Sequence, residues 1–285
     1  MVRNTILPRN RDADPEVLRK RADWVRLETI RLVEIARSGH YSSVFSCAEM
    51  FAALYYHTLR IDPANPHWAY RDRFLLGKGH AAIGQYPILV DLGYFPADWL
   101  ESYTRLGSPL GDHPDMKKVP GCDFSSGSIG HNLSVGVGMA LAARMKNSDY
   151  LTWVMLGDGE LNEGQVWEAA MAAGHYRLSN LIAIVDANGM GLDGDIVDVM
   201  NIEPVAAKFE AFGWSTAEID GHDVEAVIGA FDAAQEADRP HVIVARTRKG
   251  KGVRFMEETP YWHLGYLGPK DKEVAIREIE ERIGR

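Results

Sequence analysis

The sequence has few of the features that mark secreted, membrane or nucleic-acid-binding proteins. It holds two cysteines, Cys47 and Cys122, in 285 residues, so no disulfide framework is expected. No apolar run reaches the roughly 18 residues that a membrane-spanning helix needs. The N-terminal segment is polar and lacks the apolar region of a signal peptide. The net charge is -9, and no block of lysine or arginine suggests a nucleic-acid footprint. We therefore expect a soluble, cytoplasmic protein.

The composition that is present, 46% hydrophobic and 25% charged, is that of an ordinary globular protein. Short apolar runs predict strands at 73–76, 151–156, 181–185, 214–219 and 241–245. Longer amphipathic or apolar runs predict helices at 16–37, 47–59, 80–91, 132–146, 163–175, 204–212, 223–236 and 270–282. This alternation predicts an α/β fold, with a mostly parallel sheet and helices on both faces. We expect residues 1–285 to form a single domain, with 1–14 as a polar arm and 265–285 as a charged, exposed C-terminal tail.

One strand–helix–strand unit, residues 151–194, organises the chain. Its first strand ends in the turn Gly157-Asp158-Gly159, and its second strand ends in Asp186-Ala187-Asn188. Consecutive parallel strands are joined by a right-handed crossover, so their carboxyl ends meet at the edge where α/β sheets bind ligands. Asp158 and Asn188 would then offer a carboxylate and an amide oxygen, which suit Mg²⁺ together with phosphate oxygens and water.

Four histidines follow turn residues or lie in loops: His40, His80, His113 and His263. Loop histidines near such an edge are well suited to proton transfer. Taken singly, each is more simply interpreted as a solvated or capping histidine. Glu163 has a similar double interpretation, because an acidic residue in the first turn of a helix offsets the helix dipole without any catalytic role.

The motifs in their order resemble the N-terminal half of transketolases, within the larger group of thiamine diphosphate enzymes. The Gly-Asp-Gly turn with an asparagine thirty residues later is the pattern of that larger group. The transketolase-like motifs span about residues 20–268 and are Ser38-Gly39-His40, Gly79-His80, His113-Pro114, Gly127-Ser128-Ile129-Gly130, Gly221-His222-Asp223, Lys249-Gly250-Lys251-Gly252 and Trp262-His263.

The resemblance implies thiamine diphosphate and Mg²⁺ (or Ca²⁺ or Mn²⁺) as cofactors. The implied metal ligands are Asp158, Asn188 and the backbone carbonyl of Met190. Gly159 would contact the diphosphate, and Gly127, Ser128 and Ile129 would line the thiazolium and aminopyrimidine. His80 and His263 would lie between diphosphate and substrate, and His40 and His113 would face the ketose hydroxyls. Glu163 matches a carboxylate near the subunit interface.

The resemblance also implies an activity and a partner. A transketolase transfers a two-carbon ketol unit from a ketose, often phosphorylated, to an aldose. A full-length transketolase continues for more than as much sequence again, so this chain resembles the N-terminal subunit of a split enzyme. We expect a C-terminal partner subunit with the pyrimidine-binding domain, in an α₂β₂ heterotetramer.

Three alternatives stay open at this point: an E1 alpha-type subunit of a 2-oxo acid dehydrogenase, another thiamine diphosphate-dependent carboligase, and a cofactor-binding scaffold without catalysis. The set of histidines favours transketolase, because sugar hydroxyls need several proton donors and acceptors. The chain also departs from the family where substrate would lie, with Tyr41-Ser42 after His40 and with Asp112 before His113. These departures leave the donor sugar open.

Overall fold

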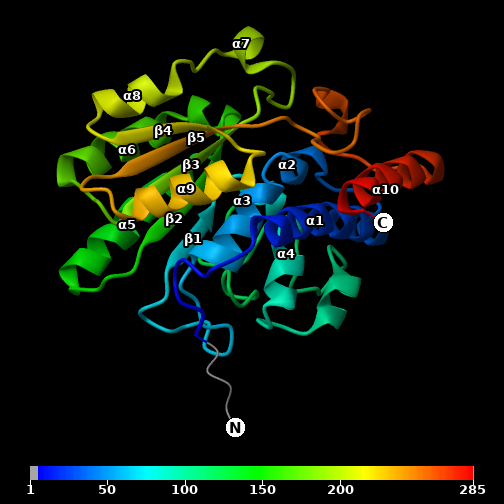
Figure 1. Ribbon diagram of the computed structural model, residues 1–285, viewed down its shortest axis with the longest axis horizontal. Coiled ribbons are helices and arrows are strands. Elements are labelled where there is room, and N and C mark those ends of the chain that lie inside the picture. Colours follow the sequence, from blue (N-terminus) through cyan, green and yellow to red (C-terminus); the bar gives the residue numbers. More distant parts are fainter. Residues whose placement is uncertain (1–5, 285) are drawn as a thin grey trace.

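The computed structural model describes residues 6–284 and contains a five-stranded, fully parallel sheet (Figure 1). The strand order is β1-β2-β3-β5-β4. The strands are β1 Arg73–Leu76, β2 Thr152–Gly157, β3 Leu181–Ala187, β4 Ser215–Asp220 and β5 His241–Arg246. The predicted α/β fold with a parallel sheet is therefore confirmed, and each expected strand is present within two residues of its expected ends.

Helices cover both faces of the sheet, and alternate strand residues divide between two cores. In β3, Ile182 and Ile184 join the core beneath α1, α3, α4 and α9, whereas Ala183 and Val185 join the core beneath α5, α6 and α8. Every residue of β3 is buried, as expected for a central parallel strand covered on both sides. The helices are α1 Pro15–Ala36, α2 Ser42–Phe45, α3 Ala48–Ala53, α4 Ala82–Asp91, α5 His131–Met145, α6 Gly164–Tyr176, α7 Ile196–Val199, α8 Val205–Ala211, α9 Val224–Gln235 and α10 Pro269–Ile283.

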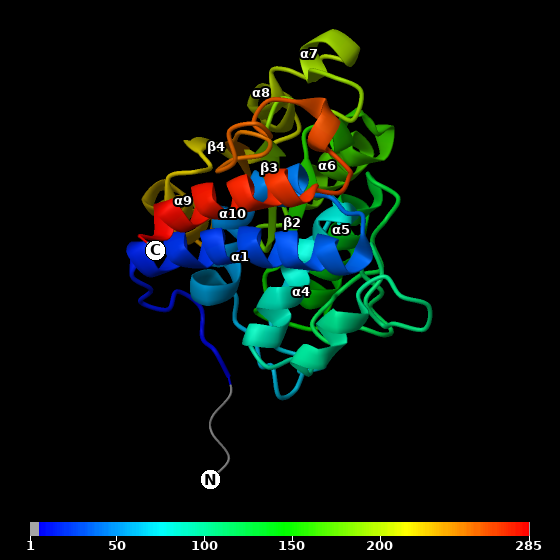
Figure 2. The same cartoon turned by 90° about the vertical axis from the view of Figure 1, so that its right-hand side faces the viewer.

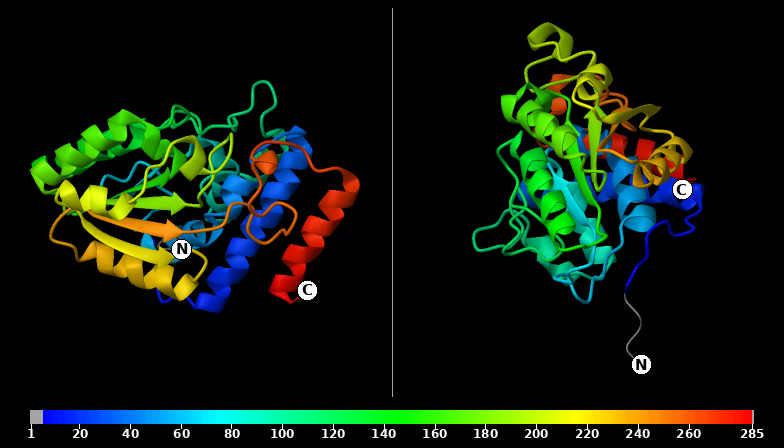
Figure 3. Two further views of the ribbon diagram at one scale, coloured as in Figure 1. Left: turned by 90° about the horizontal axis from the view of Figure 1, so that it is seen from above. Right: turned by 90° about the vertical axis from the view of Figure 1, so that its left-hand side faces the viewer.

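The parallel topology brings the carboxyl ends of the strands to one edge, where the connecting loops gather. The segment after β5 leaves the sheet at this edge, on the side to which the strand arrows point (Figure 3). Short 3₁₀ helices follow two of the strands there, at Gly79–Ala81 after β1 and at Gly159–Asn162 after β2. This edge is where an open α/β sheet binds its ligand.

Local sequence signals explain several helix ends and one irregular helix. Pro15 opens α1, and the Asp14 side chain caps it by accepting a hydrogen bond from the Glu16 amide. Asp223 caps α9 in the same way. The helix expected at 47–59 is present as α3 followed by a π-helical turn, Leu54–Thr58.

Within residues 6–284, none of the helices has the length and apolar character that a bilayer crossing requires.

The two ends of the chain differ from the sequence expectation. The C-terminal segment is helical, but α10 lies alongside α1 with Ala275 and Ile279 fully buried, so it is not an exposed tail (Figure 2). These two residues are four positions apart and share one helix face, which the surrounding charges conceal in the sequence. At the other end, the arm is docked: Leu7 bridges to Ile61, and Arg9 forms an ion pair with the buried Asp72. Residues 1–5 of the predicted arm lie outside the described residues.

Candidate cofactor site

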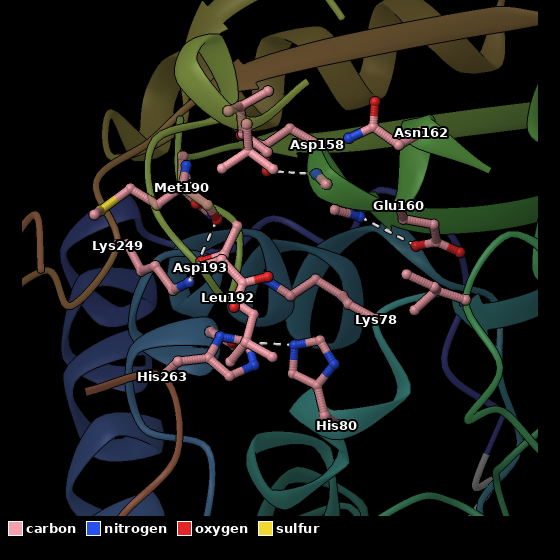
Figure 4. A pocket seen from close by; sticks show the side chains of 18 residues that line it. Lys78, His80, Asp158, Glu160, Asn162, Met190, Leu192, Asp193, Lys249 and His263 are labelled. Atoms are coloured by element: carbon pink, nitrogen blue, oxygen red, sulfur yellow. Dashed lines mark hydrogen bonds between the residues drawn. The ribbon is translucent and has the colours of Figure 1, made fainter. Parts of the chain in front are cut away.

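A cavity of about 340 Å³ opens at the carboxyl ends of β1, β2 and β3. The turn after β2 supplies Gly157, Asp158 and Gly159 to its wall, and the loop after β3 supplies Asn188 and Met190. The three metal ligands implied by the resemblance therefore line a single cavity, although they come from two different crossovers of the fold. Figure 4 shows this cavity, with Asp158 and Glu160 on one side and His80 and His263 on the other.

Asp158 is a buried carboxylate held by backbone amides. Its Oδ1 accepts a hydrogen bond from the Gly159 amide at 2.8 Å, and its Oδ2 accepts one from the Gly189 amide at 2.6 Å. Burial, and then the nearby Asp186 carboxylate, raise the pKa of Asp158 to about 6. The anion is thus oriented but poorly solvated, and a cation beside it would be stabilising.

Asn188 is oriented by its neighbours. Its Nδ2 donates to Asp186 Oδ2 at 3.3 Å, and its Oδ1 accepts from the Met190 amide at 3.1 Å. The Met190 carbonyl in turn accepts a hydrogen bond from Lys249 Nζ at 3.3 Å, and the Gly191 carbonyl accepts a second one at 2.7 Å. Burial, and then the Lys78 ammonium, lower the pKa of Lys249 to about 8.

Beneath this loop, Lys78 and Asp186 form a buried ion pair. Asp186 also accepts hydrogen bonds from the hydroxyls of Ser46 and Thr247. Burial opposes both charges, but Asp186 raises the pKa of Lys78, and Lys78 lowers the pKa of Asp186. The pair joins the ends of β1 and β3 below the cavity floor and offsets the cost of burying either charge.

Three of the four predicted histidines form a cluster. The ring centroids of His40 and His80 are 4.9 Å apart, and each lies 5.3 Å from the ring of His263. His80 Nε2 lies 3.0 Å from the Ser43 hydroxyl. Burial and then Lys78 lower the pKa of His80 well below its usual value, and burial and then Lys249 lower the pKa of His263 to about 3. His80 and His263 are therefore neutral at pH 7 and able to accept a proton.

The fourth histidine, His113, is not part of the cavity wall and lies near Asp112. Asp112 Oδ1 is 3.4 Å from His40 Nδ1, and its Oδ2 is 3.8 Å from His113 Nδ1. The ring of His113 faces Gly127, since a Cβ built on that glycine would lie 3.7 Å from His113 Cγ. The unexpected acid in the motif before His113 thus lies between two of the predicted histidines.

Not every predicted site residue lines the cavity. Ile129 does, but Gly127 and Ser128 are exposed beside it. Glu163 is exposed and lies outside the cavity, as the N-cap residue of α6. Its Cβ lies only 2.5 Å from where a Cβ on Gly130 would be.

Sequence reasoning missed several residues of the cavity wall, including two buried charged ones, and did not decide the role of Lys249. Lys78 and Glu160 are both 3% exposed and line the cavity. Burial raises the pKa of Glu160 to about 7, against two backbone amides that lower it. The sequence alone allows Lys249 to be either a substrate-steering group or part of a solvated basic loop; it is 2% exposed, which contradicts the solvated interpretation. The position of Lys78 and Glu160 directly after the buried strands β1 and β2 was the signal available in the sequence.

The family model described as the thiamine diphosphate binding domain of transketolase matches residues 17–284. The chain belongs to the transketolase family. It is 38% identical, over 94% of its length and 95% of the relative's, to a subunit of the apulose-4-phosphate transketolase of Phocaeicola vulgatus. It is 39% identical, over 93% of its length and 96% of the relative's, to a 6-deoxy-6-sulfo-D-fructose transketolase subunit of a Clostridium species.

Among solved structures, the chain is similar to transketolase from Campylobacter jejuni, with a TM-score of 0.89 and 31% identity over 95% of its length. It spans 43% of that protein. The predicted family membership is therefore confirmed, and the chain is a thiamine diphosphate-binding domain of the transketolase type. Its cavity lies at the edge of the sheet where the fold is expected to hold such a ligand.

Proposed function

We propose that this chain is the N-terminal, cofactor-binding subunit of a two-chain transketolase. The enzyme would transfer a two-carbon ketol unit from a ketose, phosphorylated or not, to an aldose acceptor. The observation that carries the proposal is the histidine cluster, His40, His80 and His263, beside a cavity that holds the three implied metal ligands. A cofactor scaffold without catalysis would not need histidines gathered there.

The residues present fit Mg²⁺ with a diphosphate. Asp158, the Oδ1 of Asn188 and the carbonyl of Met190 form a set of hard oxygen donors with a single carboxylate, which suits Mg²⁺ that keeps phosphate and water ligands. The buried Asp158 anion, with its pKa raised to about 6, is the kind of group that a divalent cation stabilises. The backbone of Gly159 would contact the diphosphate, and the Lys249 ammonium would bind the diphosphate oxygens.

The remaining residues would bind and orient the reactants. Gly127, Ser128 and Ile129 would line the organic part of the cofactor. When bound, thiamine diphosphate supplies an electron sink that allows a carbon–carbon bond next to a ketose carbonyl to break. His40 and His263 would help to remove the proton from the hydroxyl at C3 of the donor. The low pKa of His263 keeps its ring unprotonated and thus able to accept a proton. His80 would lie between diphosphate and substrate, and His113 would hold the hydroxyl at C1.

We propose that residues 1–285 act as a single cofactor-binding domain, in the cytoplasm, with a second polypeptide that carries the pyrimidine-binding domain. The match to relatives that are themselves named as transketolase subunits, over at least 95% of their length, supports a two-chain enzyme. The exposed Glu163 is available for a contact with that second polypeptide. An α₂β₂ heterotetramer is the expected assembly.

The test is reconstitution with the partner subunit, in the presence of thiamine diphosphate and Mg²⁺. A panel of ketose donors, including apulose 4-phosphate and 6-deoxy-6-sulfofructose, should give ketol transfer to an aldose with both chains and none with this chain alone. Robust turnover by the single chain would contradict the two-subunit proposal. Oxidative decarboxylation of a 2-oxo acid without ketol transfer would favour the dehydrogenase alternative.

Asp158→Ala is the matched binding test. It removes the sole carboxylate of the proposed ligand set, so calorimetry should detect no Mg²⁺-dependent binding of thiamine diphosphate by the assembled variant. Thermal unfolding of the same sample controls for folding. Unchanged cofactor affinity would refute the metal assignment.

A further inference from the structure

We propose that Glu160 is a positioning residue of the cofactor site, whose carboxylate holds the segment Gly127–Gly130 in place against the turn after β2. The proposal rests on the proposed function, because that segment matters only if the cavity binds the cofactor. Glu160 would not touch the reacting atoms. It would act through the backbone that it fixes.

Two backbone amides donate hydrogen bonds to the buried Glu160 side chain. Glu160 Oε1 accepts a hydrogen bond from the Gly130 amide at 2.8 Å, and Glu160 Oε2 accepts one from the Gly157 amide at 3.2 Å. Gly157 ends β2, and Gly130 is the N-cap residue of α5. A single carboxylate, 3% exposed, thus connects the segment before α5 with the segment that carries Asp158.

Two glycines allow the chain to pack closely around this carboxylate. A Cβ on Gly77, at the end of β1, would lie 2.5 Å and 2.7 Å from the two Glu160 oxygens. Gly130 has φ +88 and meets Glu163 on its other side, where an added Cβ would lie 2.5 Å from Glu163 Cβ. Glycines at both positions are therefore what allows the backbone to close around Glu160.

The segment fixed in this way includes the cavity wall. Ile129, one residue before Gly130, lines the same cavity as Asp158. If Glu160 releases the Gly130 amide, Ile129 and its neighbours can move relative to the metal ligands, because nothing covalent joins the two segments nearby. The cofactor site is then no longer preorganised, because binding must itself fix Ile129 relative to the metal ligands. The affinity for thiamine diphosphate falls by the free energy that this ordering costs.

The chemistry of the side chain offers a graded test. A glutamate accepts at both oxygens, a glutamine at one, and a methionine of similar size at neither. Losing a hydrogen bond weakens an interaction by about tenfold. The dissociation constant of thiamine diphosphate should thus rise about tenfold in Glu160→Gln and about a hundredfold in Glu160→Met.

The measurement is calorimetric titration of thiamine diphosphate at fixed Mg²⁺, on the chain assembled with its partner subunit. The control is Glu278→Gln, because Glu278 also accepts a backbone amide hydrogen bond, from Arg254 at 2.8 Å, but lies on α10 away from the cavity. Its cofactor affinity should equal that of the wild type. In steady-state assays, the apparent KM for thiamine diphosphate should rise in Glu160→Gln while the KM for the ketose stays unchanged; a merely structural defect would lower the amount of active enzyme without this split.

The outcomes separate the two proposals. A wild-type assembly that binds no thiamine diphosphate would overturn the proposed function. A wild type that binds normally, with Glu160→Gln binding equally well, would overturn the role of Glu160 alone. Equal losses in the glutamine and methionine variants would also overturn it, because the hydrogen bonds would then not be the cause. If the methionine variant fails to fold, the glutamine variant decides.

Discussion

Replacing Lys78 by methionine should destabilise the protein strongly, because it leaves the Asp186 carboxylate buried without its cation. Methionine keeps the length and most of the volume of the lysine stem, so the change is mainly one of charge. Removing one partner of a buried ion pair costs about 3–5 kcal/mol. Asp186 is 0% exposed, so water cannot replace the ammonium, but Ser46, Thr247 and Asn188 still donate hydrogen bonds to it. We expect a loss near the lower limit, about 3 kcal/mol.

The assay is urea unfolding of the wild type, Lys78→Met, Asp186→Asn and the double variant, in the presence of a metal chelator. A two-state analysis with unchanged m values would give the change in the free energy of unfolding. The double variant leaves no unpaired charge at positions 78 and 186, so it should lose less than Lys78→Met alone, and the coupling energy of the cycle should be at least about 2 kcal/mol. A loss below about 1 kcal/mol in Lys78→Met, or additive losses in the cycle, would refute the reasoning.

Two further predictions concern the stability of the same scaffold. Burial opposes the charge of Glu49, but Arg26 and His222 lower its pKa to about 2, from a value near 4.5 in the unfolded chain. The ionised Glu49 therefore contributes stability above pH 4.5, and this stability is lost as the pH falls toward 2. The stability gap between wild type and Glu49→Gln in urea titrations should narrow by up to about 3 kcal/mol between pH 5 and pH 2, and a constant gap would contradict this. Gly174→Ala in α6 should destabilise the protein by about 3 kcal/mol or more, because the added Cβ would lie 1.8 Å from the Phe212 carbonyl oxygen. Gly138→Ala in α5, where an added Cβ would have nothing within 4 Å, should stabilise the protein by about 0.5–1 kcal/mol. Thermal unfolding measures both changes, and similar effects for the two variants would contradict the packing argument.

The strands and the convergence of the metal-site residues could be predicted because they depend on simple periodicity. A short apolar run such as Leu181–Val185 predicts a buried strand. Consecutive parallel strands bring their carboxyl ends to the same edge of the sheet. Asp158 and Asn188, thirty positions apart, follow directly from that rule. Their presence in one cavity needed no long-range information beyond the fold class.

The buried charged residues could not be predicted in the same way. Lys78 and Glu160 look like ordinary polar residues after a strand, and their burial depends on partners far away in sequence, Asp186 and Gly130. The face of α10 was missed for a related reason, since two apolar residues among many charges predict a helix but not what covers it. Local sequence patterns predict the helices and strands. The partner of a buried charged side chain, by contrast, depends on which helices and strands pack together in the fold.

The two lysines connect the phosphate end of the cavity with the histidine end. Lys78 lowers the pKa of His80, and Lys249 lowers the pKa of His263, in each case after the effect of burial. An ammonium that attracts an anionic group therefore also keeps a neighbouring imidazole neutral, and a neutral imidazole is what proton abstraction requires. An anion bound beside Lys249 would offset its charge, so His263 would become a stronger base in the loaded site than in the free one. The site thus couples anion binding to the basicity of the groups that would accept the proton, through charges that this chain supplies by itself.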